Sequence, residues 1–178
     1  MEGAKFRLYS DKDLKNEVYI KKIEDGYCVI NRDFSGNSVP EEAVEMESDS
    51  NGNFIIFGLD SGTYYLKETS APTGYRPLLD PIVLKLKAVF TEERNSYIKG
   101  EGGTDKILQK LEANVYMKEF LNGDFEERNI ELVTDSENGS ANLNVINTVG
   151  KKLPVTGSSA MLLSLIHISE PTRQEAIS

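Results

Sequence analysis

Residues 49–75 have the sequence DSNGNFIIFGLDSGTYYLKETSAPTGY. An apolar run extends from Phe54 to Leu59, and aromatic and charged side chains alternate in a second run from Thr63 to Thr69. Asparagine, aspartate, serine and glycine occupy the positions before and between the two runs, and these residues favour tight turns. The pattern predicts two strands joined as a β-hairpin.

Glu68 is expected to point into the protein interior. Side chains alternate between the two faces of a strand, so Tyr64, Leu66 and Glu68 share one face, whereas Tyr65 and Lys67 lie on the other. A carboxylate on an apolar face must be protonated, paired or hydrogen-bonded, because an isolated buried charge is very costly. Glu68 therefore marks either a functional site or a satisfied polar network.

Short candidate strands recur along the rest of the chain. They are expected at residues 4–9, 18–20, 27–30, 82–89, 114–120, 130–133 and 141–148. Residues 104–112 contain an N-cap candidate followed by apolar residues at helical spacing, which predicts one short helix. Strands at these intervals indicate an all-β sandwich.

The composition excludes several classes of function. The chain has 178 residues, 39% of them hydrophobic, and a formal net charge of −9, which suits one domain and argues against binding to nucleic acid or anionic membranes. Cys28 is the single cysteine and His167 the single histidine. We therefore expect no intrachain disulfide, catalytic triad, cofactor or metal site. The acidic residues between Glu41 and Asp49 are expected to form a solvated face rather than a loose calcium site.

Residues 64–75, YYLKETSAPTGY, resemble the E-box region of the Cna B-type, or SpaA-like, domains of Gram-positive pilins and surface adhesins. Asn53-Phe54 and Gly58-Leu59 match the same pattern upstream. The resemblance implies an immunoglobulin-like, prealbumin-like β-sandwich over residues 3–149. It also implies a secreted structural protein that is not an enzyme.

The resemblance also implies a covalent crosslink. In this family a lysine of the first strand, an asparagine of the last strand and the E-box acid form an intramolecular isopeptide bond without an external enzyme. Glu68 corresponds to the acid, and Asn147, on the same strand face as Leu143 and Val145, corresponds to the asparagine. Burial favours a neutral acid and a neutral lysine, so the acid can polarise the amide carbonyl while the amine attacks and ammonia leaves. The alternative is that both residues are hydrogen-bonded polar residues of the core.

The lysine of the family has no counterpart in this chain. It precedes a Gly-Ala-x-Phe-x-Leu segment, which here occupies residues 3–8. Lys5 alternates with Ala4 and Phe6, so its side chain is expected to face water. We therefore expect the natural amino terminus, with the lysine and an export signal, to be missing from this sequence.

Leu153, Pro154, Val155, Thr156 and Gly157 resemble the sorting signal that sortase cleaves between threonine and glycine. Pro154 fixes its own φ angle and disfavours helix at Leu153, which keeps the segment extended. The resemblance implies that the threonine carbonyl is joined to an amine of peptidoglycan or of another pilin subunit. The expected location is therefore the Gram-positive cell wall, with sortase as a partner.

The segment after this motif departs from the family. Residues 150–164 are assigned to the sorting signal and the start of a hydrophobic membrane stop. The apolar run of residues 158–166 is about half of the roughly 20 residues that span a bilayer. Residues 165–178 resemble translated sequencing-adaptor read-through, so we expect them to be non-native.

The expected function is that of a pilin subunit or wall-anchored surface protein, with this chain as its carboxy-terminal domain. The alternative is a ligand-binding adhesin module that recognises a host extracellular matrix protein or a carbohydrate. Such a module needs an exposed aromatic platform, for which the candidates are Tyr9, Tyr19, Tyr27 and Tyr97.

Overall fold

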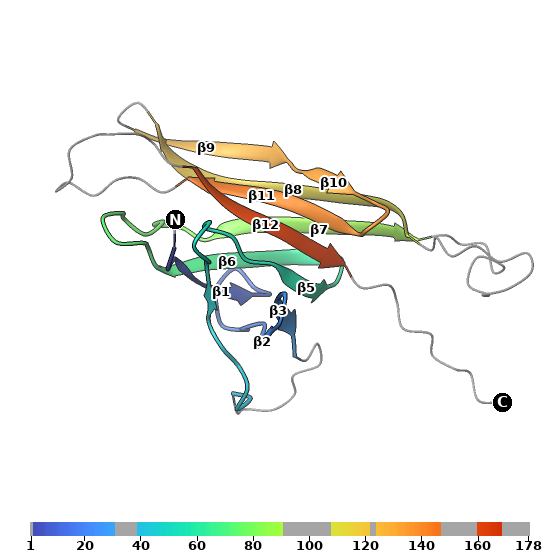
Figure 1. Cartoon of the computed structure of the whole chain (residues 1–178). Helices are drawn as coiled ribbons and strands as arrows, with labels where there is room; N and C mark the ends of the chain where they lie inside the picture. The colour runs from blue at the N-terminus through green and yellow to red at the C-terminus, as the bar shows by residue number, and fades with distance from the viewer. Residues whose placement is uncertain (1, 31–38, 91–107, 122–123, 147–159, 169–178) are drawn as a thin grey trace, which may run out of the picture.

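The computed structural model describes residues 2–30, 39–90, 108–121, 124–146 and 160–168 (Figure 1). In this part of the chain all regular structure is β, and the strands form two sheets. The first sheet has the order β4 (Met46–Glu47), β1 (Lys5–Tyr9), β6 (Gly62–Ser70), β7 (Ile82–Phe90), β8 (Leu108–Leu121) and β9 (Asp124–Glu131). The second has the order β10 (Val133–Asp135), β11 (Ser140–Ile146), β12 (Ala160–Ile168), β5 (Ile56–Leu59), β3 (Gly26–Val29) and β2 (Ile20–Ile23).

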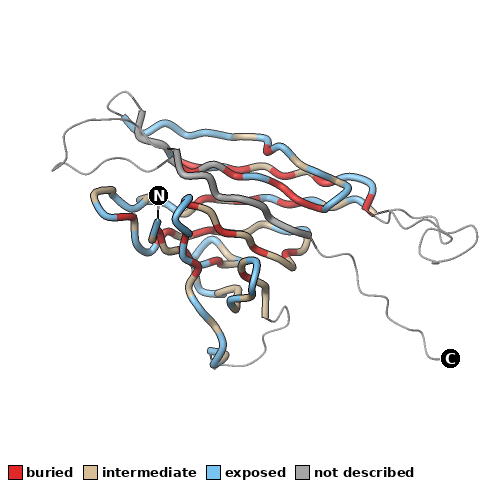
Figure 2. The backbone as a smooth tube through the Cα atoms, viewed as in Figure 1, coloured by how far each residue is buried: buried red, intermediate tan, exposed pale blue. Residues whose placement is uncertain are grey.

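The hydrophobic core lies between the two sheets, and buried positions recur along the strands of both (Figure 2). Alternation decides which side chains enter it, because every second residue of a strand faces inward. The buried side chains of the core include Phe6, Leu8, Leu66, Leu84 and Val115 of the first sheet and Ile20, Ile56, Leu143 and Val145 of the second. The predicted all-β sandwich is confirmed.

The predicted hairpin of residues 54–69 is wrong, because its two strands belong to different sheets. β5 pairs with β3 and β12, whereas β6 pairs with β1 and β7. Gly58 has a φ angle of +82°, and Ile56 and Leu59 on either side of it are both buried. Phe57 and Leu59 pair with the successive residues His167 and Ile168, so Gly58 is the extra residue of a bulge, and the chain leaves the second sheet only after Leu59. The Tyr64 hydroxyl accepts a hydrogen bond from the backbone N–H of Asp60 and donates one to its carbonyl, both at 3.1 Å. These bonds stabilise the turn between β5 and β6.

The predicted short helix is also wrong where the structure describes it, because residues 108–112 belong to β8. Leu108 pairs with Phe90 and Lys110 with Val89, so one residue of β8 is left unpaired in an irregularity of the ladder. This β-bulge puts Leu108 and Leu111 on the same buried face, three residues apart. That spacing imitates the period of a helix. Residues 104–107 lie outside the described residues.

β12 occupies a position inside the second sheet. Its backbone pairs antiparallel with β11 and parallel with β5. The sandwich was expected to end at residue 149. β12 lies beyond that residue and includes parts of both following segments, 150–164 and 165–178. An apolar run of this length suits a strand that has neighbours on both sides.

Among the described residues, no helix is long and apolar enough to span a membrane.

Candidate functional site

Glu68 lies in the middle of the first sheet with its side chain in the core. It sits on β6, opposite Phe6 of β1, and only 2% of its surface is exposed. Leu66, two residues earlier on the same face, is also buried. This confirms the predicted inward orientation of Glu68. Its role in a crosslink stays a prediction.

The loop between β6 and β7 brings a hydrogen-bond donor to this carboxyl group. The backbone N–H of Leu78 donates to Oε2 of Glu68 at 2.7 Å. On the opposite face of β6, the Lys67 Nζ donates to the backbone carbonyl of Leu79 at 3.0 Å. Two successive residues of the loop are therefore fastened to two successive residues of the strand. The Leu78 contact could not be predicted from the sequence, because it depends on the path of the loop.

The path of this loop follows from its turn residues. Gly74 has a φ angle of +91°, a conformation that glycine adopts without strain. The backbone N–H of Tyr75 donates to the carbonyl of Pro72 at 3.0 Å, which closes a turn. The turn reverses the chain soon after β6, so the following residues return toward Glu68. The E-box sequence thus contains both the acid and the turn that directs the chain back toward it.

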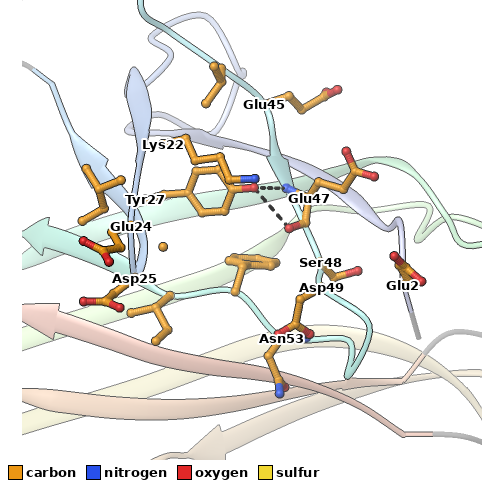
Figure 3. A pocket seen from close by; sticks show the side chains of 15 residues that line it. Glu2, Lys22, Glu24, Asp25, Tyr27, Glu45, Glu47, Ser48, Asp49 and Asn53 are labelled. Atoms are coloured by element: carbon orange, nitrogen blue, oxygen red, sulfur yellow. Dashed lines mark hydrogen bonds between the residues drawn. The ribbon is translucent and has the colours of Figure 1, made fainter.

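Tyr27 links the two sheets at one edge of the sandwich. Its hydroxyl accepts a hydrogen bond from the backbone N–H of Glu47 at 2.9 Å and donates one to the Glu47 carbonyl at 3.2 Å (Figure 3). Its ring is buried and packs edge-on against Phe54, with the ring centroids 6.4 Å apart. β3 of the second sheet is thereby tied to β4 of the first.

An acidic pocket of about 770 Å3 lies beside this link (Figure 3). Its carboxylates come from Glu2, Glu24, Asp25, Glu45, Glu47 and Asp49. The Asp49 Oδ1 already accepts the backbone N–H groups of Asn51 and Asn53, each at 2.8 Å, in a local turn. Among the residues that the structure describes, no group of three or more histidine, cysteine, aspartate or glutamate side chains is arranged to hold a metal ion.

A family model agrees with this fold. The model of the SpaA prealbumin-like fold domain matches residues 1–99. The chain belongs to the SpaA family of prealbumin-like fold domains. Such domains are structural modules of pilin and adhesin type, typical of pilus proteins at the cell surface. The comparisons with curated proteins and with solved structures yield no match.

The match covers the first seven strands of the SpaA domain and includes Glu68. Asn147 and the predicted sorting signal, Leu153–Gly157, lie outside the described residues. On β11 the side chains of Leu143 and Val145 are buried, at 3% and 0% exposure. The alternation from which the direction of Asn147 is predicted is therefore present at Leu143 and Val145. The direction of Asn147 itself stays a prediction.

Lys5 of the SpaA domain faces away from Glu68, as its place in the alternation predicts. Its side chain is 44% exposed, and its Nζ lies 3.8 Å from a carboxylate oxygen of Glu47. Ala4 and Phe6 on either side are fully buried. Lys5 is thus held on the outer face of the first sheet, where it cannot reach the buried acid.

At least one of the four tyrosines considered for an aromatic platform is not at the surface of the SpaA domain. Tyr27 is 5% exposed and belongs to the core, and Tyr97 lies outside the described residues. Tyr9 lies on the outer face of the first sheet, directly opposite Tyr65. Sequence reasoning missed Tyr65 as the partner of Tyr9. The alternation of side chains along β6 already places Tyr65 on the outward face and could have indicated it.

Proposed function

We propose that this SpaA domain is the carboxy-terminal structural module of a sortase-anchored surface protein or pilin subunit of a Gram-positive bacterium. The observation that carries the proposal is the buried Glu68 on β6, 2% exposed, in the position of the family's E-box acid. The sequence after β11 supports it, because the sorting motif of residues 153–157 follows soon after that strand. In this role the chain is a substrate of sortase and not itself an enzyme.

Burial of Glu68 needs a functional explanation, because an apolar residue would fill the same position without a desolvation cost. The N–H group of Leu78 offsets part of this cost through its 2.7 Å hydrogen bond. That bond favours the ionised carboxyl group, whereas burial favours the neutral one. We take this buried, hydrogen-bonded carboxyl group as the acid of the proposed crosslink.

The proposed crosslink joins Asn147 to the lysine that the first strand supplies in this family. The lysine nitrogen attacks the side-chain carbonyl carbon of Asn147 and forms a new amide bond. The bond between that carbon and the asparagine Nδ2 breaks, and the nitrogen leaves as ammonia. Glu68 holds a proton on the carbonyl oxygen during the attack and transfers the amine proton to the leaving group. Fixed packing in the sandwich supplies the proximity.

Intact mass spectrometry tests the crosslink in a chain extended upstream to include the family's lysine. The mass is expected to fall by that of one ammonia, and Glu68→Ala is expected to abolish this loss. Glu47→Ala is the matched control, because the Glu47 side chain is 53% exposed on β4 of the same sheet, and it should leave the loss intact. An extended chain that keeps its full mass would defeat the crosslink proposal.

The anchoring step uses Thr156 as the acyl donor. A sortase breaks the bond between Thr156 and Gly157, which releases the segment that contains β12, and joins the threonine carbonyl to an amine of peptidoglycan or of another pilin subunit. In a sortase-bearing host, a chain supplied with an export signal and a complete membrane stop should become attached to the wall. Thr156→Ala should release it to the medium, whereas Ser158→Ala, just beyond the motif, should not. Continued attachment of the Thr156→Ala chain counts against sorting through this motif.

A further inference from the structure

The part of β6 that carries Glu68 lies beside a loop. The ladder between β6 and β7 ends at Leu66, which pairs with Ile82. Lys67 and Glu68 follow Leu66 directly on β6. The loop of residues 71–81, which joins the two strands, contacts β6 at these two positions. The loop therefore takes the place of β7 along this part of the strand.

The two contacts of the loop lie on opposite faces of β6. In the core the Leu78 N–H group donates to Oε2 of Glu68 at 2.7 Å, and on the outer face the Lys67 Nζ donates to the Leu79 carbonyl at 3.0 Å. Leu78 and Leu79 are adjacent, so only their own φ and ψ angles lie between the N–H group and the carbonyl. A bond that fixes the carbonyl thus restricts the direction of the N–H group.

The backbone of Leu79 has little packing of its own to hold it. The Leu79 side chain is 71% exposed, whereas that of Leu78 is partly buried against the core. Lys67 is half-buried, and its ammonium group can only donate hydrogen bonds. A hydrogen bond from a charged donor is about twice as strong as one between neutral groups. Lys67 is therefore well suited to fix the Leu79 carbonyl.

The next residue, Asp80, attaches the loop at a third point. Its carboxylate lies 3.1 Å from the Nζ of Lys118 on β8, and the two side chains are 52% and 46% exposed. An exposed ion pair of this kind contributes little to stability. It also acts on a side chain two residues beyond Leu78, so Lys67 provides the nearer constraint on the Leu78 N–H group.

The Leu78 bond distinguishes the two oxygen atoms of Glu68. In a neutral carboxyl group one oxygen carries the proton, and the other is the better acceptor of a hydrogen bond. An N–H group directed at Oε2 favours Oε2 as the acceptor, so the proton lies on Oε1. The direction of the Leu78 N–H group thus selects the oxygen that holds the proton needed for the crosslink.

We propose that Lys67 is a positioning residue for Glu68. Through the Leu79 carbonyl it holds the Leu78 N–H group on Oε2, and the proton of the neutral acid lies on Oε1. Lys67 acts only through the loop, because its side chain lies on the opposite face of β6 from Glu68. The inference rests on the proposed crosslink, but the link between Lys67 and Leu78 is measurable without it.

Amide hydrogen exchange at Leu78, measured by NMR on the full chain, tests this link. Lys67→Met removes the donor but keeps a long side chain, and the protection of Leu78 should fall by about threefold or more. Lys67→Arg keeps a cationic donor and should keep the protection. Lys85→Met is the matched control, because Lys85 is on the same outer face, opposite Thr63 and away from the loop. The amide of Leu84, in the central strand β7, shows whether each variant is folded.

The rate at which the extended chain loses ammonia, followed by intact mass, tests the effect on the acid. Lys67→Met should lower this rate by about threefold or more, whereas Lys67→Arg and Lys85→Met should leave it near that of the unchanged chain. Unchanged Leu78 protection in Lys67→Met overturns the proposal, and so does reduced protection with an unchanged rate. If no extended chain loses ammonia, the crosslink itself fails, and Leu78 exchange still supports or overturns the link to Lys67.

Discussion

Replacement of Glu68 by alanine should destabilise the domain through the loss of one buried hydrogen-bond acceptor. The Leu78 N–H group now donates to Oε2 of Glu68 at 2.7 Å, and the acid is 2% exposed. An unsatisfied donor of this kind costs about 1–3 kcal/mol, and the side-chain carbons removed from the core add about 1 kcal/mol. Because Leu78 is only partly buried, water can reach it in part, and we expect a total of about 2–3 kcal/mol.

Glu68→Gln separates the acceptor from the charge. Its amide oxygen can still accept the Leu78 bond, so the expected loss is below about 1 kcal/mol. The free energy of unfolding is measured by urea denaturation of the unextended chain, followed by circular dichroism, with the slope required to stay constant. Glu47→Ala serves as the exposed control and should change stability by less than about 1 kcal/mol. The Leu78 hydrogen bond does not stabilise the domain as stated if the glutamine variant is as unstable as the alanine variant, or if neither variant differs from the control.

Three further perturbations test the loops and the link between the sheets. The pKa of Asp11 is lowered, chiefly by a hydrogen bond from the backbone N–H of Asn16. Asp11 therefore stabilises the folded chain above the pKa of the unfolded state, and this stabilisation is lost as the pH falls through the lower pKa of the folded state. NMR titration measures the pKa of Asp11. Tyr27→Phe removes both hydroxyl bonds to Glu47 and should cost about 1–3 kcal/mol in urea denaturation. Gly26→Ala should lower the melting temperature markedly, because its φ angle is +147° and a Cβ atom would lie 2.7 Å from a backbone oxygen.

Each of these expectations has a contrary result. An Asp11 that titrates at or above its usual value would mean that the loop bonds do not form in solution. A Tyr27→Phe chain as stable as the unchanged one would mean that water replaces both bonds without cost, with Tyr65→Phe on the outer face as the comparison. An unaltered melting temperature for Gly26→Ala would contradict the close approach of the backbone at that turn.

Alternation along single strands predicted much of the candidate site. It placed Glu68 and Leu66 inside and Lys5 outside, because the period of two is a local property of an extended chain. The same rule gives the outward direction of Tyr65. The contact of Leu78 with Glu68 could not be predicted in this way, since it depends on where a loop of turn residues returns.

Sequence reasoning failed where the meaning of a pattern depends on the partner strand. Residues 54–69 have the turn chemistry of a hairpin, yet the chain leaves the second sheet after Leu59, and β5 and β6 belong to different sheets. Apolar residues at 108 and 111 imitate a helix because a bulge against β7 inserts one extra residue. Both errors concern pairing between segments, which local propensity does not encode.

The Tyr27 hydroxyl also protects the outermost strand of the first sheet. β4 has β1 on one side only, and an unpaired strand edge of this kind can recruit a strand from another molecule. At Glu47 both backbone groups are occupied by the phenol oxygen. An incoming chain would have to displace the tyrosine before it could extend the sheet there, so this edge is closed to uncontrolled strand addition at that residue.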